Sequence, residues 1–346
     1  SNTDSNQARL STLGLSVWPE LFLRVIGRSS LRLFSMSQQT AVCPLPAHQA
    51  GLYREPGMHA HYVEYRLNPP ADVAAIKQAL AQALVPVSEG YVAVAFGADC
   101  WEYLQPNWRP DDLVSFTGVQ GEFSMPASQA DILFWVHGED RGDVMATVLH
   151  IEQAMKDVAR VVLDISGFKN KTSRDLTGFV DGTANPKEAQ RIAAAQIAAG
   201  RPGAGGSYVF SQQWQHNLAA FNELPVRQQE QVIGRTKRDN IELEGDAMPP
   251  DSHVSRTDVK VDGIAMKIYR RSTPYYCNEQ DKGLYFLCFA SELRRIQIQL
   301  ERMVGCSGDG LSDRLMHYST AVSGSYWFMP AAGDLLQLLK DVDARL

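Results

Sequence analysis

Cysteine is scarce in this sequence, and its cysteines form no motif. Five occur in 346 residues, and no C-x-x-C pair is found among Cys43, Cys100, Cys277, Cys288 and Cys306. An odd number of scattered cysteines argues against a disulfide framework, a zinc ribbon and a thioredoxin-like site. The C-x-x-C-H motif that attaches haem covalently is absent as well. We therefore expect reduced cysteines and a cytoplasmic protein.

Long hydrophobic runs are missing too. A membrane-spanning helix needs roughly 20 apolar residues, and the apolar stretch 13–26 is interrupted by Pro19, Glu20 and Arg24. We expect no membrane partner. The chain starts with Ser1 rather than methionine, and we interpret residues 1–40 as a tag, a leader or a disordered extension.

The chain also lacks an excess of positive charge. Lysine and arginine number 33 against 39 aspartates and glutamates, which gives a formal net charge of -6. This is the wrong sign for a phosphate backbone, so we expect no nucleic-acid partner. Hydrophobic residues make up 45% and charged residues 21%, a balance typical of a globular protein. The length allows two domains or one duplicated fold.

Hydrophobic periodicity predicts the same order of elements twice. In the first half, strands are predicted at 61–67, 91–96 and 131–136, and helices at 71–84 and 143–159. In the second half, strands are predicted at 207–210, 265–270 and 284–290, and helices near 225–233 and 292–303. The polar, glycine-containing stretch 165–186 is predicted to be a long connecting loop.

This repeated order predicts an α+β fold. Each half suits a split βαβ (ferredoxin-like) unit, and two copies would place two antiparallel sheets against each other with peripheral helices. We therefore divide the chain into an extension at 1–40, an N-terminal half at 41–165 and a C-terminal half at 166–346.

The run from Gly178 to Pro186, GFVDGTANP, is the most unusual local sequence. Asp181 follows two apolar residues and precedes a glycine, so it is a candidate proton shuttle held by tight backbone geometry. The alternative is an acid that forms an Asx-turn or a helix entry. A phosphatase motif is disfavoured, because Phe179 occupies the position of the aspartate nucleophile.

Two further segments carry candidate site residues. His253 lies in a polar segment that we expect to be a loop, and one axial histidine is sufficient to hold haem iron, whereas zinc needs three or four ligands. A structural histidine is the alternative. If the predicted strand 265–270 continues, Arg270 and Ser272 face one side and Arg271 the other. The alternative is a strand end whose cations extend into solvent.

Together these residues carry a family resemblance. GFVDGTANP, then His253, then Arg270 with Ser272, and finally Asp313 occur in the order found in dye-decolourising peroxidases. The chain is similar to the compact bacterial type of that family from about Cys43 to Leu346. The resemblance implies a duplicated ferredoxin-like fold and one non-covalent haem b per chain, with His253 as the iron ligand. It also implies that Asp313 accepts a hydrogen bond from His253, although Asp309 is near in the sequence.

The resemblance implies a mechanism as well. Asp181 would move the peroxide proton, Arg270 would stabilise the developing charge, and Ser272 would support that network. Hydrogen peroxide would be reduced through a ferryl intermediate, and a small organic electron donor, such as a dye or phenol, would be oxidised by one-electron steps. The family implies a homo-oligomer, a dimer or larger. The C-terminal end at 341–346 has no glycine- and proline-rich tail, so we do not expect encapsulated cargo.

Two other functions are weighed against the peroxidase. The same pocket in a haem-handling protein could serve haem storage, delivery or iron release from haem. A scaffold without a cofactor is the third reading. The pair Asp181 and Arg270 favours the peroxidase, because a haem carrier needs neither a distal acid nor a distal cation.

Overall fold

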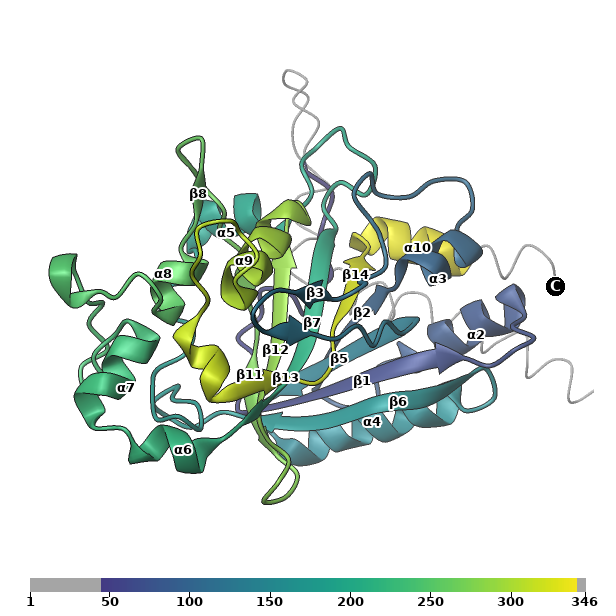
Figure 1. Cartoon of the computed structure of the whole chain (residues 1–346). Helices are drawn as coiled ribbons and strands as arrows, with labels where there is room; N and C mark the ends of the chain where they lie inside the picture. The colour runs from purple at the N-terminus through teal and green to yellow at the C-terminus, as the bar shows by residue number, and fades with distance from the viewer. Residues whose placement is uncertain (1–44, 341–346) are drawn as a thin grey trace, which may run out of the picture.

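A computed structural model of the chain describes residues 45–340 (Figure 1). The first half is a four-stranded antiparallel sheet in the order β2-β5-β1-β6. Its elements are β1 (His59–Leu67), α2 (Val73–Ala83), β2 (Tyr91–Phe96), β5 (Ile132–Gly138), α4 (Arg141–Met155) and β6 (Ala159–Phe168). This order of strands and helices is that of a split βαβ unit.

The second half repeats the arrangement with longer insertions. Its main strands follow the order β14-β7-β12-β11, again antiparallel. They are β7 (Ser207–His216), β11 (Thr273–Tyr276), β12 (Lys282–Ala290) and β14 (Ser325–Met329), with helix α9 (Arg294–Val304) before β14. The two sheets join at each edge through one residue pair, Phe96 with Phe328 and Gly167 with Tyr275. The predicted duplicated α+β fold is therefore confirmed.

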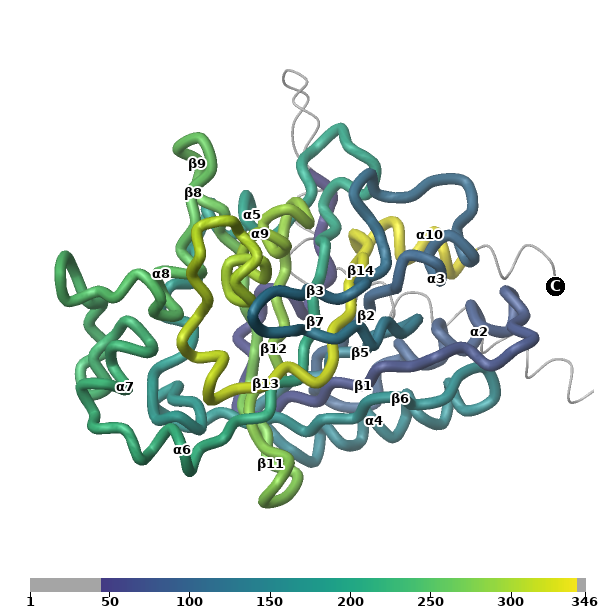
Figure 2. The backbone as a smooth tube through the Cα atoms, viewed as in Figure 1, coloured from purple at the N-terminus to yellow at the C-terminus, as the bar shows by residue number. Residues whose placement is uncertain are grey.

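Smaller elements surround these sheets. They include β3 (Val119–Gln120), β4 (Ser124–Met125), β8 (Lys260–Val261), β9 (Ile264–Ala265), β10 (Tyr269–Arg270) and β13 (Ser319–Ala321). The helices are α3 (Ala98–Leu104), α5 (Glu188–Ala195), α6 (Leu218–Glu223), α7 (Val226–Ile233), α8 (His253–Thr257) and α10 (Ala332–Lys340), with the 3₁₀ turns η2 (Gly245–Ala247) and η3 (Arg314–His317). In Figures 1 and 2, α6, α7 and α8 form a lobe on one side of the β7–β12 ladder.

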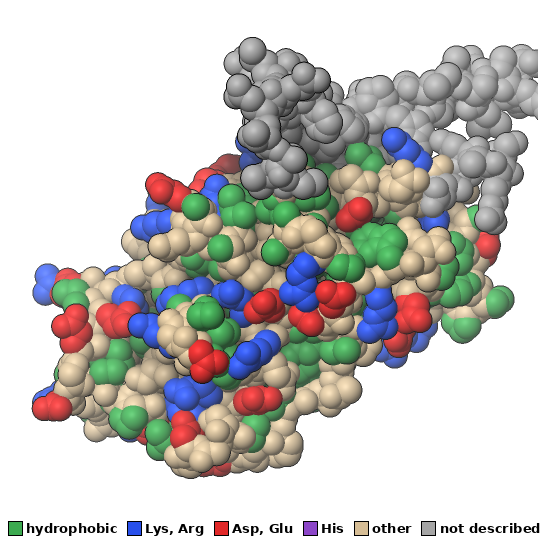
Figure 3. Space-filling view, turned by 90° about the horizontal axis from the view of Figure 1, so that it is seen from above, with side chains coloured by type: hydrophobic (Ala, Val, Ile, Leu, Met, Phe, Trp, Pro, Cys, Tyr) green, Lys and Arg blue, Asp and Glu red, His purple; other side chains and the backbone are tan. Residues whose placement is uncertain are grey.

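Both faces of the central strands are buried, and their side chains alternate between two cores. In β5, Leu133 and Trp135 belong to the core between the sheets, whereas Phe134 and Val136 pack in the core that includes helices α2 and α4. Successive side chains of a strand point to opposite faces, so a strand buried on both sides is apolar throughout. This explains the continuous apolar run of β5. On the face shown in Figure 3, acidic and basic side chains are interspersed.

The structure corrects several predicted elements. The predicted helix 143–159 ends at Met155, and the following strand β6 occupies part of the predicted loop 165–186. Strand β6 was missed because polar residues such as Arg160, Asp164 and Ser166 interrupt its apolar pattern. The predicted strand 265–270 is replaced by the short strands β9 and β10, because residues 266–268 line a cleft instead of pairing.

Some predictions fall outside the described residues. These are the extension at 1–40, Cys43 and the C-terminal end at 341–346. Within 45–340, Cys100, Cys277, Cys288 and Cys306 are free thiols. No helix of that range is both long enough and apolar enough to span a membrane.

Glu64 is an acid buried in the core between the sheets. Its side chain on β1 is 1% exposed and accepts hydrogen bonds from the hydroxyls of Tyr285 at 2.8 Å and Ser211 at 2.9 Å. Burial raises the pKa of Glu64 from 4.5 to about 7, although the two hydrogen bonds act in the opposite direction. The folded protein therefore holds this proton more tightly than the unfolded chain does.

This proton makes stability fall as pH rises. The contribution of the Glu64 proton to the free energy of unfolding is fully present below pH 4.5 and is lost as pH rises through about 7. The free energy of unfolding falls by about 3 kcal/mol over this range. Glu64→Gln keeps the size of the side chain and removes its titration. We expect urea unfolding at pH 5 and pH 8 to show this loss in the wild type and in Glu89→Gln, an exposed control, but not in Glu64→Gln. Equal pH dependence in all three proteins would contradict the assignment.

Candidate active site

The candidate site is a deep cleft between the β7–β12 ladder and the α7–α9 region, with an empty volume of about 1590 Å³ including its mouth. Most of its lining is apolar. One wall consists of side chains from β7 and β12, and another comes from helix α9. The apolar members are Phe179, Val180, Ala184, Trp214, Ile233, Val254, Met266, Ile268, Leu284, Phe286, Ile296, Leu300, Met303, Leu315 and Met316. The cleft therefore fits a large, mainly apolar ligand.

Asp181 reaches this cleft from the glycine-flanked run. Its backbone N–H donates to the carbonyl of Ser173 at 2.9 Å, and its Oδ1 accepts from the N–H of Gly182 at 2.7 Å. Gly178 and Gly182 have φ values of 84° and 86°, a region that disfavours other residues, so both glycines are needed for this turn. Asp181 therefore both forms an Asx-like contact and lines the cleft, and the turn directs its carboxylate toward the cleft.

Arg270 is the cation beside Asp181. Its Nη1 lies 3.1 Å from Asp181 Oδ1, and both side chains are about one quarter exposed. Both residues line the cleft. Asn185 fixes the backbone of Arg270 from both sides, because its Nδ2 donates to the Arg270 carbonyl and its Oδ1 accepts from the Arg270 N–H, each at 2.8 Å. Our sequence analysis missed Asn185, although it lies in the same GFVDGTANP run.

Ser272 lies beside this pair but outside the cleft. Its buried hydroxyl accepts a hydrogen bond from the N–H of Leu287 at 3.2 Å and lines a smaller pocket with Asp181 and Arg270. The predicted alternation of sides is wrong, because β10 ends at Arg270 and Arg271 lines the same small pocket.

His253 enters the cleft from a helix rather than from the predicted loop. It is the first residue of α8, whose N-cap Ser252 accepts from the N–H of Ser255. His253 Nδ1 lies 2.6 Å from Oδ2 of Asp313, which is fully buried and also accepts from the N–H of Leu315. A carboxylate at Nδ1 assigns the proton to that nitrogen, so Nε2 keeps its lone pair as a ligand atom.

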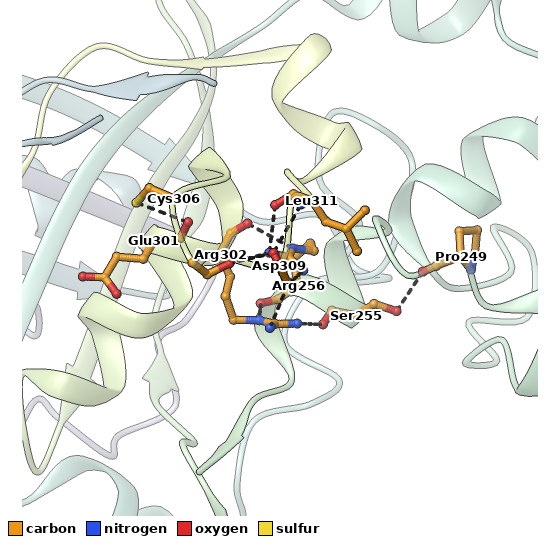
Figure 4. Close-up of polar contacts among 9 residues, drawn as sticks. Pro249, Ser255, Arg256, Glu301, Arg302, Cys306, Asp309 and Leu311 are labelled. Atoms are coloured by element: carbon orange, nitrogen blue, oxygen red, sulfur yellow. Dashed lines mark hydrogen bonds and ion pairs between the residues drawn. The ribbon is translucent and has the colours of Figure 1, made fainter. Parts of the chain in front are cut away.

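The nearby Asp309 has a different partner. Its carboxylate pairs with the guanidinium of Arg256, at 2.6 Å and 3.1 Å, and Arg302 also contacts it at 3.4 Å (Figure 4). The Arg256 side chain is 1% exposed and also donates to the carbonyls of Arg302 and Leu311. This ion pair lowers the pKa of Asp309. It attaches α8 to the loop that leads to Asp313.

A second arginine–aspartate ion pair also joins the segment around His253 to the segment around Asp313. Arg314 binds Asp251 through Nη2 at 2.8 Å and Nε at 3.1 Å. The segments 251–256 and 309–314 are therefore joined at three points, with the His253–Asp313 hydrogen bond between two arginine–aspartate pairs. This fixes the orientation of the imidazole ring.

Two polar side chains of the cleft were missed by our sequence analysis. Gln212 and His216 on β7 line the cleft, and the amide of Gln212 and the Nε2 of His216 are buried without a partner among the described residues. Burial lowers the pKa of His216 to about 4, so the ring is neutral. Alternate residues of β7 place both on the cleft side. The sequence does not show which face of β7 lines the cleft, so these two residues could not be identified without the fold.

The duplicated fold thus holds an acid–arginine pair and a carboxylate-bound histidine in one apolar cleft. Residues 56–169 match the family profile described as Dyp-type peroxidase, N-terminal, and residues 172–334 match Dyp-type peroxidase, C-terminal. A dye-decolorizing peroxidase of Mycobacterium tuberculosis is 35% identical over 249 residues, 71% of this chain and 74% of that protein. The chain belongs to the Dyp-type peroxidase family and is a peroxidase of that kind.

Solved structures agree with this assignment. DyPB from Rhodococcus jostii superposes with a TM-score of 0.78 at 30% identity, covering 82% of this chain and 96% of that one. A variant of that protein was solved in complex with heme. A dye-decolorizing protein from V. cholerae has a TM-score of 0.75 at 35% identity, covering 83% and 98%. Proteins of Yersinia named deferrochelatase match at a lower identity, 24%, and over a smaller share of this chain, 47%.

Proposed function

We propose that the cleft binds one haem b without a covalent bond and that the chain uses it to oxidise small organic donors with hydrogen peroxide. One observation carries this proposal. A histidine whose Nδ1 is bound to a buried carboxylate lines the same apolar cleft as the Asp181–Arg270 ion pair. The first pair suits an iron ligand, and the second suits proton transfer and charge stabilisation during peroxide reduction.

The residues of the cleft fit haem. A porphyrin is mainly apolar with polar carboxylates at one edge, and the cleft combines a mainly apolar lining with a few buried polar atoms. The orphaned amide of Gln212 and Nε2 of His216 are such atoms, and buried polar groups normally have partners. Arg235 is a cation of the lining, although Glu242 already pairs with it at 2.6 Å.

His253 would hold the iron through Nε2. Asp313 accepts from Nδ1, which makes the imidazole a stronger electron donor and fixes its ring plane. The haem would supply redox chemistry, taking oxidising equivalents from peroxide and giving them to a donor one electron at a time. His253 and its carboxylate partner Asp313 would be the means by which the protein tunes that chemistry.

Asp181 and Arg270 would act on peroxide. Asp181 Oδ2 takes the proton from one peroxide oxygen and returns it to the oxygen that leaves as water, while Arg270 stabilises the negative charge that develops. Asn185 keeps Arg270 in place through its two backbone contacts. Ser272 uses its hydroxyl hydrogen, which the Leu287 contact leaves available, to bind a solute or water beside the pair.

The remaining assignments extend this proposal. We assign the site to a C-terminal half at 166–346, preceded by a half at 41–165, because Asp181, His253, Arg270 and Asp313 all lie in the second. A homo-oligomer and a cytoplasmic location, which the family resemblance and the cysteine content imply, stay predictions.

The test separates a peroxidase from a haem-handling protein. Protein loaded with haemin is mixed with hydrogen peroxide and a phenolic donor, and both oxidised donor and iron-free porphyrin are measured. We expect about two donor molecules oxidised per peroxide, with the haem intact, because peroxide accepts two electrons and the donor gives one. Iron-free porphyrin without donor oxidation would contradict the proposal and would favour iron release from haem.

A further inference from the structure

A second, smaller pocket lies on the other side of the Asp181–Arg270 pair. It has an empty volume of about 490 Å³ including the open space at its mouth, and it shares Asp175, Asp181 and Arg270 with the cleft. We call it the basic pocket. Its complete lining is Lys169, Ser173, Arg174, Asp175, Asp181, Gly182, Asn185, Arg270, Arg271, Ser272 and Pro274. The lining is mainly polar, unlike that of the cleft.

Positive charge exceeds negative charge in the basic pocket. Its lining contains four cations, Lys169, Arg174, Arg270 and Arg271, and the two acids Asp175 and Asp181. The whole chain carries a formal net charge of -6, so the excess of positive charge in this pocket is a local feature. Asp181 already pairs with Arg270. The carboxylate of Asp175 accepts from the N–H and hydroxyl of Thr177, and burial raises its pKa to about 6.

Lys169 and Arg271 have no ion-pair partner within 4.0 Å in the part of the chain that the structure describes. The Arg271 guanidinium instead donates to the backbone carbonyls of Leu52 at 3.2 Å and Arg54 at 3.0 Å. Burial, with the Arg271 charge as the second cause, lowers the pKa of Lys169, whereas the charges of Asp181 and Glu55 act in the opposite direction. The two cations repel each other in a partly buried pocket, which favours a bound anion.

We propose that the basic pocket is a binding site for small carboxylate anions. Lys169 and the free edge of the Arg271 guanidinium supply the charge, and the Ser272 hydroxyl supplies a neutral donor. A carboxylate is planar and accepts several hydrogen bonds, which suits an arginine beside a lysine. The pocket is too polar for a large aromatic donor and large enough for a short carboxylic acid.

Such an anion would also affect the proposed reaction. It would lie against the Asp181–Arg270 pair and compete for Arg270, so it would raise the KM for peroxide. This consequence rests on the proposed function, whereas anion binding itself does not, because the basic pocket is complete without haem.

The binding test uses cofactor-free protein and two matched probes. Acetate and acetamide have nearly the same shape, but only acetate is charged. We expect saturation-transfer NMR to show acetate bound and acetamide unbound, and we expect Lys169→Gln and Arg271→Gln each to weaken acetate binding about tenfold. Lys171→Gln, two residues from Lys169 and outside the lining, serves as the charge-matched control and keeps wild-type affinity.

Equal binding of acetate and acetamide, or unchanged acetate affinity in Lys169→Gln, would overturn the proposal. Lys169→Gln is the decisive variant, because Arg271 also supports the backbone at Leu52 and Arg54. In haemin-loaded protein, acetate is then expected to raise the KM for peroxide in the wild type more than in Lys169→Gln. Acetate binding without peroxidase activity would sustain the anion site and refute only the proposed function.

Discussion

Asp181→Asn is expected to slow the reaction of the haem-loaded protein with hydrogen peroxide by about 10²–10⁴-fold. The amide has the size of the carboxylate and can still contact Arg270, but it cannot accept the peroxide proton. The cleft and His253 are unchanged, so haem binding should stay at the wild-type level. The expected defect is therefore kinetic and confined to the peroxide step.

Stopped-flow absorbance after mixing with peroxide measures this rate directly. Asp239→Asn removes an exposed acid whose nearest cation, Arg238, is 3.9 Å away, and it should react like the wild type. Arg270→Leu should also react slowly, by about 10²–10³-fold, because it removes the charge stabilisation. If Asp181→Asn reacts at the wild-type rate and only Arg270→Leu is slow, the proton-transfer role of Asp181 is wrong.

His253→Ala is expected to lose haem. Removing a partner of a metal ligand typically costs 10–100-fold in affinity, so removing the ligand itself should cost more than about 100-fold. Haemin titration followed by the Soret band measures this affinity. His317→Ala, which removes an exposed histidine outside the cleft lining, should bind haem as the wild type does.

Two further observations make this second prediction specific. Imidazole added to His253→Ala should restore the ligand and the Soret band, because Asp313 and the apolar lining remain in place. Asp313→Asn should retain haem, with a higher reduction potential, because the ring nitrogen then faces a neutral acceptor. Wild-type haem affinity in His253→Ala would remove His253 from the ligand role.

Much of the fold could be predicted from local patterns. The strands β1, β2 and β5 and the helices α2 and α7 were predicted nearly at their observed bounds, since both apolar alternation and helical spacing are local signals. Strand β6 could not be predicted, because many of its side chains are exposed and it shows no apolar alternation. Its pairing with β1, which is distant in the sequence, holds it as a strand. The helix start at His253 was also hidden in a polar segment, where Ser252 is the only capping signal.

The candidate site could be predicted only in part. Four of the side chains named by the resemblance meet as two contacting pairs, Asp181 with Arg270 and His253 with Asp313. The choice between Asp313 and Asp309 needed the fold, since both lie between α9 and η3. Asn185 acts through backbone contacts that no spacing indicates. Lys169 and Arg271 come from distant parts of the chain, and only the fold unites them in the basic pocket. The chemical roles of all these residues stay predictions.

One set of absorption spectra tests the central claim most directly. Cofactor-free wild type, His253→Ala and Asp181→Asn are each titrated with haemin and then mixed with one equivalent of hydrogen peroxide. We predict that the wild type and Asp181→Asn bind one haem per chain, that His253→Ala does not, and that only the wild type changes its spectrum rapidly on adding peroxide. A wild-type protein that takes up no haem, or three proteins with identical spectra and rates, would contradict the account.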